Sequence, residues 1–75
     1  MTLLAEAIRN APFASISPAE AESFASMLRT SPVALAELLD DDASTHEMCD
    51  NWIKAGVIRN LAKRVRRASI ETEVE

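Results

Sequence analysis

The chain has 75 residues, so it forms one domain at most, and a core of that size is only marginally stable without a disulfide, a metal or a partner. Cys49 is the only cysteine, which excludes a disulfide within the chain. The net charge is −4, but residues 1–50 carry nine acidic residues against two basic ones, whereas residues 51–75 carry six basic residues against three acidic ones. Such a polarised chain is expected to dock on a charged partner or on a second copy.

The composition favours an all-α fold. One glycine, three prolines and no tyrosine accompany many alanines and leucines, and no strand-like alternation or internal repeat occurs. We expect a small bundle of four or five short helices, with the C-terminal helical region long or broken near Gly56. Residues 1–70 form a single helical domain, and residues 71–75 form a frayed acidic tail.

The first expected helix is short. Thr2 can cap it, and Leu4, Ile8 and Ala11 lie on one stripe of its surface. Pro12 ends it, because the residue before a proline leaves the α region.

The second expected helix has a clear start. Ser17 is the N-cap, Pro18 occupies the first helical position, and Glu20 closes a capping box. Ile16 precedes the cap and can staple the entry of the chain. The apolar residues follow at helical spacing: Ala21, Phe24, Ala25 and Leu28.

The third expected helix repeats this start with Ser31 and Pro32. Its apolar edge is formed by Leu35, Leu38 and Leu39. We expect it to stop in "DDDAS", because three adjacent aspartates repel one another and sit badly at the negative end of a helix dipole. Ser44 and Glu47 form a second S-x-x-E box, which predicts that a new helix begins near Thr45.

The last helical region contains "WIKAGVIRNLAKRVRR". On a helical wheel the apolar residues from Val57 to Ala68 share one arc, and those from Thr45 to Ala55 centre on nearly the opposite side. A straight helix would therefore have to move its buried face by roughly 150° near Gly56. Two explanations remain open: a break with Gly56 as a left-handed C-cap, or one long helix that serves two partners. The break is favoured, because a glycine inside a helix costs about 1 kcal/mol.

The expected core combines the apolar residues of these helices. Its members are Leu4, Ile8, Phe13, Ile16, Phe24, Leu28, Leu35, Leu38, Leu39, Met48, Trp52, Ile58, Leu61 and Val65.

Catalysis is not indicated. His46 is the only histidine, and a single glycine cannot build an oxyanion or phosphate loop, so we expect a non-enzymatic protein without a cofactor or small-molecule substrate. His46 and Cys49 would share a helix face, but structural zinc needs four ligands, so no metal site is expected. We expect His46 in solvent at a helix start and Cys49 buried as a small hydrophobe.

A basic stripe raises the question of DNA. Its members are Arg59, Lys63, Arg64, Arg66 and Arg67, which lie along one side of a helix and can track phosphates. A helix-turn-helix with Gly56 in its turn would place Trp52 where that motif needs a small residue. The segment from Val33 to about Arg59 resembles the excisionase-type or MerR-like pattern, in which "AELL" is followed by a turn, a Ser-Thr cap and a helix ending "WIKAG".

That resemblance implies DNA binding, but the segment departs from the pattern. It is about three residues too long between Leu39 and Trp52. The helix that would read DNA carries His46, Glu47 and Asp50 where the pattern has basic residues.

The sequence therefore favours a small protein-interaction or regulatory module. Its partner-binding residues are expected to be Trp52, Ile58, Leu61 and Val65, which bind a partner protein or form a homodimer. A DNA-binding regulator of helix-turn-helix type is the alternative. No apolar run is long enough for a membrane span, and the absence of a secretory segment leads us to expect a cytoplasmic protein. Short chains of this kind are common in phage and plasmids, so an accessory protein of such an element is expected.

Overall fold

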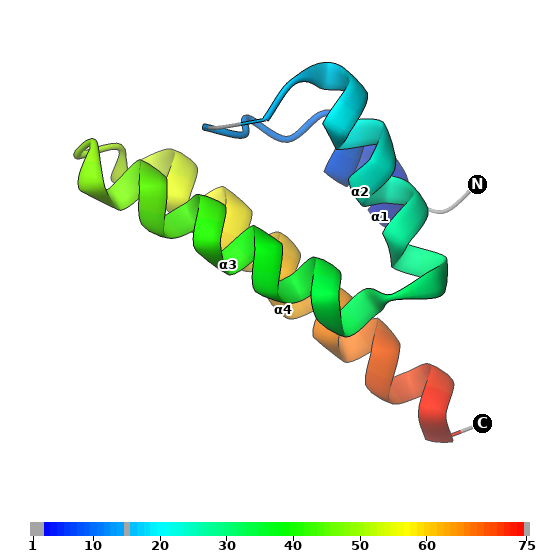
Figure 1. Cartoon of the computed structure of the whole chain (residues 1–75). Coiled ribbons are helices and arrows are strands. Elements are labelled where there is room, and N and C mark those ends of the chain that lie inside the picture. Colours follow the sequence, from blue (N-terminus) through cyan, green and yellow to red (C-terminus); the bar gives the residue numbers. More distant parts are fainter. Residues whose placement is uncertain (1–2, 15, 75) are drawn as a thin grey trace.

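The protein is described here by a computed structural model, which covers the backbone of residues 3–14 and 16–74 and the side chains of residues 3–14 and 16–69. Within these residues it has four helices and no strand: α1 (Leu3–Arg9), α2 (Pro18–Thr30), α3 (Pro32–Met48) and α4 (Trp52–Val74). Helices α3 and α4 lie side by side as a long antiparallel hairpin, and α1 and α2 pack across one side of it (Figure 1). The predicted all-α bundle is confirmed.

Helix α1 is shorter than its apolar stripe predicted. It ends at Arg9, ahead of Pro12, with Ile8 fully buried and Leu4 and Ala11 half-buried. Thr2 lies outside the described residues, so its capping role stays a prediction.

Helix α2 begins as predicted. The Ser17 hydroxyl accepts a hydrogen bond from the backbone N–H of Glu20 at 3.3 Å, and Pro18 occupies the first helical position. Phe24 points into the core, where Phe13 meets it edge-on with ring centroids 5.3 Å apart. Such an edge-to-face pair contributes about 0.5–1.5 kcal/mol beyond the area it buries. The ring pair therefore packs the segment between α1 and α2 against α2.

Helix α3 does not stop at the aspartates. It runs without interruption from Pro32 to Met48, so the predicted end in "DDDAS" and the predicted restart near Thr45 are both wrong. Two of the three carboxylates have partners from distant parts of the chain: Asp40 pairs with Arg66, and Asp42 accepts the N–H of Ala14. These tertiary contacts offset the local repulsion on which the prediction rested.

The start of α3 and its supposed inner cap also differ in detail. Ser31 is the N-cap residue, as predicted, but its hydroxyl makes no capping hydrogen bond, and its backbone N–H donates to the carbonyl of Met27. Ser44 and Glu47 lie inside α3, so they do not form a capping box.

The true end of α3 is a left-handed cap at Asp50. Its φ is 59°, its N–H donates to the carbonyl of Glu47 at 3.0 Å, and the N–H of Asn51 donates to the carbonyl of His46 at 2.8 Å. This pair of bonds is the Schellman motif, which usually uses glycine but tolerates Asp or Asn in the left-handed region. The predicted cap at Gly56 is therefore wrong.

Helix α4 passes through Gly56 without a break. Gly56 has no positive φ, and a Cβ added to it would meet nothing within 4 Å. Neither backbone conformation nor close packing within the chain therefore requires a glycine here, although it costs the helix about 1 kcal/mol relative to alanine.

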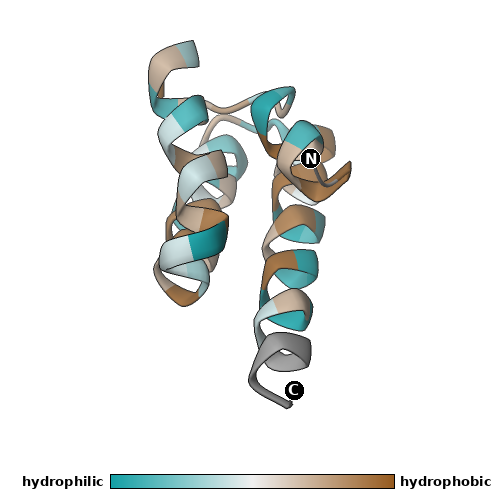
Figure 2. Cartoon of the chain, turned by 90° about the vertical axis from the view of Figure 1, so that its right-hand side faces the viewer, coloured by the Kyte–Doolittle hydropathy of each residue, from teal (hydrophilic) through white to brown (hydrophobic). Residues whose placement is uncertain are grey.

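The apolar face of α4 packs on α3. Most of its buried residues follow the alternating spacing of three and four that is typical of antiparallel helix pairs: Ala55, Ile58, Ala62, Val65 and Ser69. Leu61, beside Ala62, is buried as well. In Figure 2, apolar and hydrophilic residues alternate along the turns of α4 that lead to the C-terminus, as expected for a helix with one buried face. The facing core residues of α3 include Leu39 and Ala43, which are fully buried. Ile58, Leu61 and Val65 belong to the chain's own core, as predicted. Their predicted role in binding a partner stays a prediction.

Two ion pairs flank this interface. Arg59 of α4 pairs with Glu47 of α3, and Arg66 of α4 pairs with Asp40 of α3. The two pairs are seven residues apart on each helix, in opposite directions along the chain. Both pairs are partly exposed, and such pairs contribute about 0.2–1 kcal/mol each. They are consistent with the antiparallel register, whereas the buried apolar residues supply most of its stability.

Most of the predicted core is confirmed, but three members are wrong. Leu38 is 39% exposed, Trp52 63% and Met48 86%. The remaining predicted core residues are buried or half-buried: Leu4, Ile8, Phe13, Ile16, Phe24, Leu28, Leu35, Leu39, Ile58, Leu61 and Val65.

The backbone of residues 71–74 belongs to α4. The side chains of residues 70–75 and the placement of Glu75 lie outside the described part of the chain, so the acidic tail stays a prediction.

Two isoleucines on α4 provide a matched test of which face is buried. Ile58 is fully buried and Ile53 is 84% exposed. Ile58→Val should lower the free energy of unfolding by about 0.5–1.5 kcal/mol and Ile58→Ala by about 2–5 kcal/mol, because each leaves a cavity. The same substitutions at Ile53 should stay within about 0.5 kcal/mol of the wild type. Urea unfolding followed by circular dichroism measures both, and equal losses at the two positions would contradict the burial described here.

Candidate functional site

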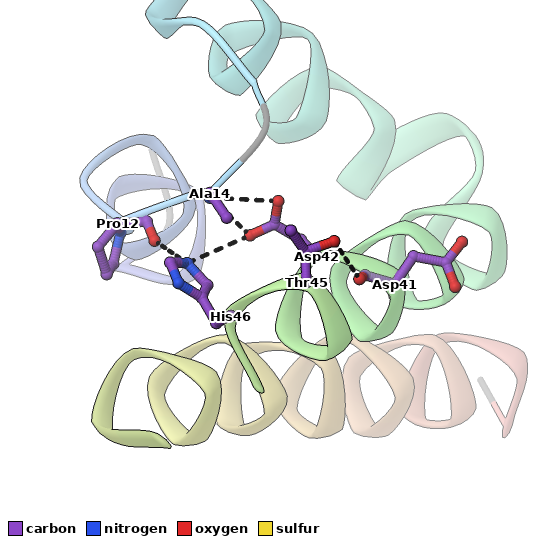
Figure 3. Close-up of polar contacts among 6 residues, drawn as sticks. All are labelled: Pro12, Ala14, Asp41, Asp42, Thr45 and His46. Atoms are coloured by element: carbon purple, nitrogen blue, oxygen red, sulfur yellow. Dashed lines mark hydrogen bonds and ion pairs between the residues drawn. The ribbon is translucent and has the colours of Figure 1, made fainter. Parts of the chain in front are cut away.

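A buried polar pair on α3 holds the connection between α1 and α2. His46 and Asp42 are 5% and 4% exposed, and both point from α3 toward the segment containing Pro12 and Ala14 (Figure 3). His46 Nε2 lies 2.6 Å from the carbonyl oxygen of Pro12, and the Ala14 N–H donates to Asp42 Oδ2 at 3.0 Å. Because a carbonyl oxygen only accepts, Nε2 carries the proton of the His46 bond.

This pair fastens two segments that lie far apart in the sequence. Asp42 Oδ2 is 3.6 Å from His46 Nε2, which is longer than a hydrogen bond, so each side chain makes its short contact with a main-chain group. The expectation of a solvent-exposed His46 is wrong, and the expectation of a buried Cys49 is also wrong, because its thiol is exposed.

No group of three or more metal-ligating side chains occurs among the described residues. Every buried side-chain nitrogen or oxygen in this part of the chain has a hydrogen-bond partner. The polar groups of the described interior are therefore satisfied within the fold.

Four of the seven large apolar side chains that are exposed in the described part of the chain lie on the last turn of α3 and the first two turns of α4. We call this region the tip surface and define it by Met48, Trp52, Ile53 and Val57, which are 86%, 63%, 84% and 42% exposed. A single exposed apolar residue is ordinary, whereas four of them at one end of a helix pair make this region a candidate binding surface. Of the residues predicted to bind a partner, only Trp52 lies here.

Gly56 lies within the tip surface. It is four residues after Trp52 and three after Ile53, so on a helix it is the neighbour of both in the next turn. Gly56 carries no side chain and the space above it is open, so the surface of α4 has a low point beside Trp52 and Ile53.

The predicted basic stripe divides into two groups. Arg59 and Arg66 are occupied by Glu47 and Asp40, at the edge of the interface between α3 and α4. The second group, which we call the basic strip, is defined by its three members: Lys63, Arg64 and Arg67.

The basic strip continues the tip surface along α4. All three of its side chains are exposed, and no ion pair joins them to the side chains that the structure describes. At about 100° per residue, Lys63 and Arg67 fall within roughly 20° of Gly56, and Arg64 falls near Ile53. The outward face of α4 is thus apolar near its start and basic farther along.

The helix-turn-helix arrangement is not found in this part of the chain. The resemblance to excisionase-type and MerR-like proteins requires a turn after "AELL", but Glu37 to Leu39 lie within the uninterrupted α3. In a helix-turn-helix the two helices cross at a large angle, whereas α4 packs along the length of α3 (Figure 1).

Sequence reasoning therefore located Trp52 and the basic residues but missed the tip surface as a unit. It assigned Met48 and Trp52 to the core because they stand at helical spacing, and spacing does not distinguish the buried face from the opposite one. The Asp-Asn pair at residues 50–51, which tolerates left-handed backbone, was the available signal for the true turn.

None of the described helices is long and apolar enough to cross a membrane. Comparison of the chain with protein-family models, curated proteins and solved structures finds no match.

Neighbouring aspartates test the fastening role of the polar pair. Asp42→Ala should lower the free energy of unfolding by about 1–3 kcal/mol, because it leaves the Ala14 N–H without its acceptor. Asp41→Ala removes an exposed carboxylate one residue away and should change stability by no more than about 0.5 kcal/mol. Chemical denaturation measures both variants. A loss at Asp41 as large as that at Asp42 would show that the Ala14 contact does not stabilise the fold.

Proposed function

We propose that the chain is a non-enzymatic protein-interaction module of a regulatory kind, and that it binds its partner through the tip surface. The observation that carries the proposal is the gathering of four exposed apolar side chains around the turn between α3 and α4. Trp52 is the anchor, because tryptophan is among the residues most enriched at the energetic centres of protein interfaces.

The tip surface is available for binding without any change in the fold. The opposite face of α4 is already buried, so the hairpin of α3 and α4 exposes Trp52 and Ile53 near its turn. Burying one large apolar side chain such as Ile53 completely at an interface contributes about 1.5–3 kcal/mol to the free energy of binding. Association costs about 4 kcal/mol or more in lost translational and rotational freedom. The few apolar side chains of the tip surface therefore need polar contacts around them for tight binding.

Self-association is a narrower form of the same proposal. Ile58, Leu61 and Val65 are at most 4% exposed, so they offer little surface to a second copy. A homodimer of this protein would instead use the tip surface.

A second candidate function rests on the basic strip. Three exposed cations without a recorded ion-pair partner in the described part of the chain support a DNA-binding regulator that contacts phosphates. The charge layout favours it less, because the chain is acidic overall and Arg59 and Arg66 are already paired.

Capture of a partner from native lysate tests the main proposal. Trp52→Ala should reduce the captured partner to background, because it removes the anchor of the tip surface. Val33→Ala is the matched control, since Val33 is 59% exposed on α3 and lies outside the tip surface. Quantitative mass spectrometry of the captured proteins measures the difference. Partner recovery that is the same for the wild type and Trp52→Ala would contradict the proposal.

Duplex binding at varied salt tests the second candidate. If Arg64 and Arg67 contact phosphates, replacing both with alanine should flatten the slope of log K against log salt by about 1.8. Replacing the paired Arg59 and Arg66 should leave that slope nearly unchanged. Fluorescence anisotropy of a labelled duplex provides the measurement. No binding of the wild-type protein at low salt would eliminate the DNA function.

A further inference from the structure

The outward face of α4 has a charge pattern that restricts its partner. From Asn51 to Ile70 the sequence contains no acidic residue. The tip surface is followed by Lys63, Arg64 and Arg67, which lie about 10–16 Å beyond Gly56 at a rise of 1.5 Å per residue. A partner that covers this face therefore needs an apolar anchor and negative charge at that distance from it.

Gly56 adds a constraint on shape. The only glycine of the chain lies inside α4, in its second turn, where it has no positive φ and has open space above it. Small residues at such positions let two helices approach closely, because no Cβ separates the backbones. Trp52 and Ile53 on the preceding turn, with Asn60 on the following turn, border this low point.

We propose that the occupant of the tip surface is an amphipathic helix of another protein, which crosses α4 at Gly56 and places acidic side chains over the basic strip. The inference rests on the proposed function and names the chemistry of its partner. The apolar face of that helix covers Trp52 and Ile53, and its carboxylates pair with Lys63 and Arg67. Opposite charges at the rim of an interface raise the association rate and fix the register of the partner.

A second α4 does not meet this requirement. Its outward face carries the same three cations and no acidic residue between Asn51 and Ile70, so two basic strips brought together would repel each other. The charge pattern therefore favours a different, acidic helix over a second copy packed α4 to α4.

Trp52 makes a direct test practical. It is the only tryptophan, and the chain has no tyrosine, so the fluorescence of the intact protein reports on the tip surface itself. Two synthetic helical peptides serve as probes. Both have the same leucine-rich face, and they differ only in three residues placed about 10–16 Å along the helix from its centre, which are glutamates in one peptide and lysines in the other.

The glutamate peptide should shift the Trp52 emission to shorter wavelength and bind about ten-fold more tightly than the lysine peptide at low salt. High salt should reduce this difference. The triple variant Lys63→Glu, Arg64→Glu and Arg67→Glu should reverse the preference. Gly56→Leu should weaken both peptides about ten-fold while circular dichroism shows an intact helical fold, because leucine fills the low point between the helices.

Several outcomes would overturn the inference. Equal affinity for the two peptides would exclude an acidic partner but leave apolar docking at the tip surface standing. A Trp52 shift that depends on protein concentration alone would identify a second copy as the occupant. Duplex DNA that binds more tightly than the glutamate peptide at the same salt would assign the basic strip to nucleic acid. If neither peptide shifts the Trp52 emission, the inference of an acidic helical partner is rejected. The capture experiment with Trp52→Ala tests the proposed function separately.

Discussion

The packing of α4 along α3 decides the rest of the structure. It buries Ile58 and Val65 completely against residues such as Leu39, and these contacts fix which side of α4 faces inward. Because a helix has one inward side, Trp52 and Ile53 are then directed outward at the start of α4. The tip surface is thus a consequence of the core, and its exposure follows from the same register that stabilises the hairpin.

Helices α1 and α2 join this hairpin through the shared apolar core, which includes Ile8 and Phe24, and through polar contacts. Asp42 and His46 hold the main chain at Ala14 and Pro12, and the edge-on ring pair of Phe13 and Phe24 packs beside them. Hydrogen bonds to buried carboxylates stabilise the native state, and leaving such a group unpaired is costly. Asp42 and His46 therefore connect α3 to the segment between α1 and α2.

The sequence predicted the starts of α2 and α3 well because caps are local. Ser17 and Pro18 needed only their immediate neighbours to be recognised, and helical spacing located most of the buried leucines and phenylalanines. The errors concern distant contacts. Asp40 and Asp42 suggested a helix end because Arg66 and Ala14, which compensate them, lie 26 and 28 residues away. The wheel around Gly56 suggested a broken helix because apolar residues were assumed to be buried, and Trp52 and Ile53 are not.

The emission spectrum of Trp52 in the unbound protein tests the central claim, that the inward face of α4 is occupied by α3 and that the start of α4 faces outward. In dilute solution the account predicts an emission maximum close to that of free tryptophan in water and strong quenching by acrylamide, in a protein that is folded by circular dichroism. A blue-shifted maximum with little quenching in the folded monomer would place Trp52 in the core and contradict it.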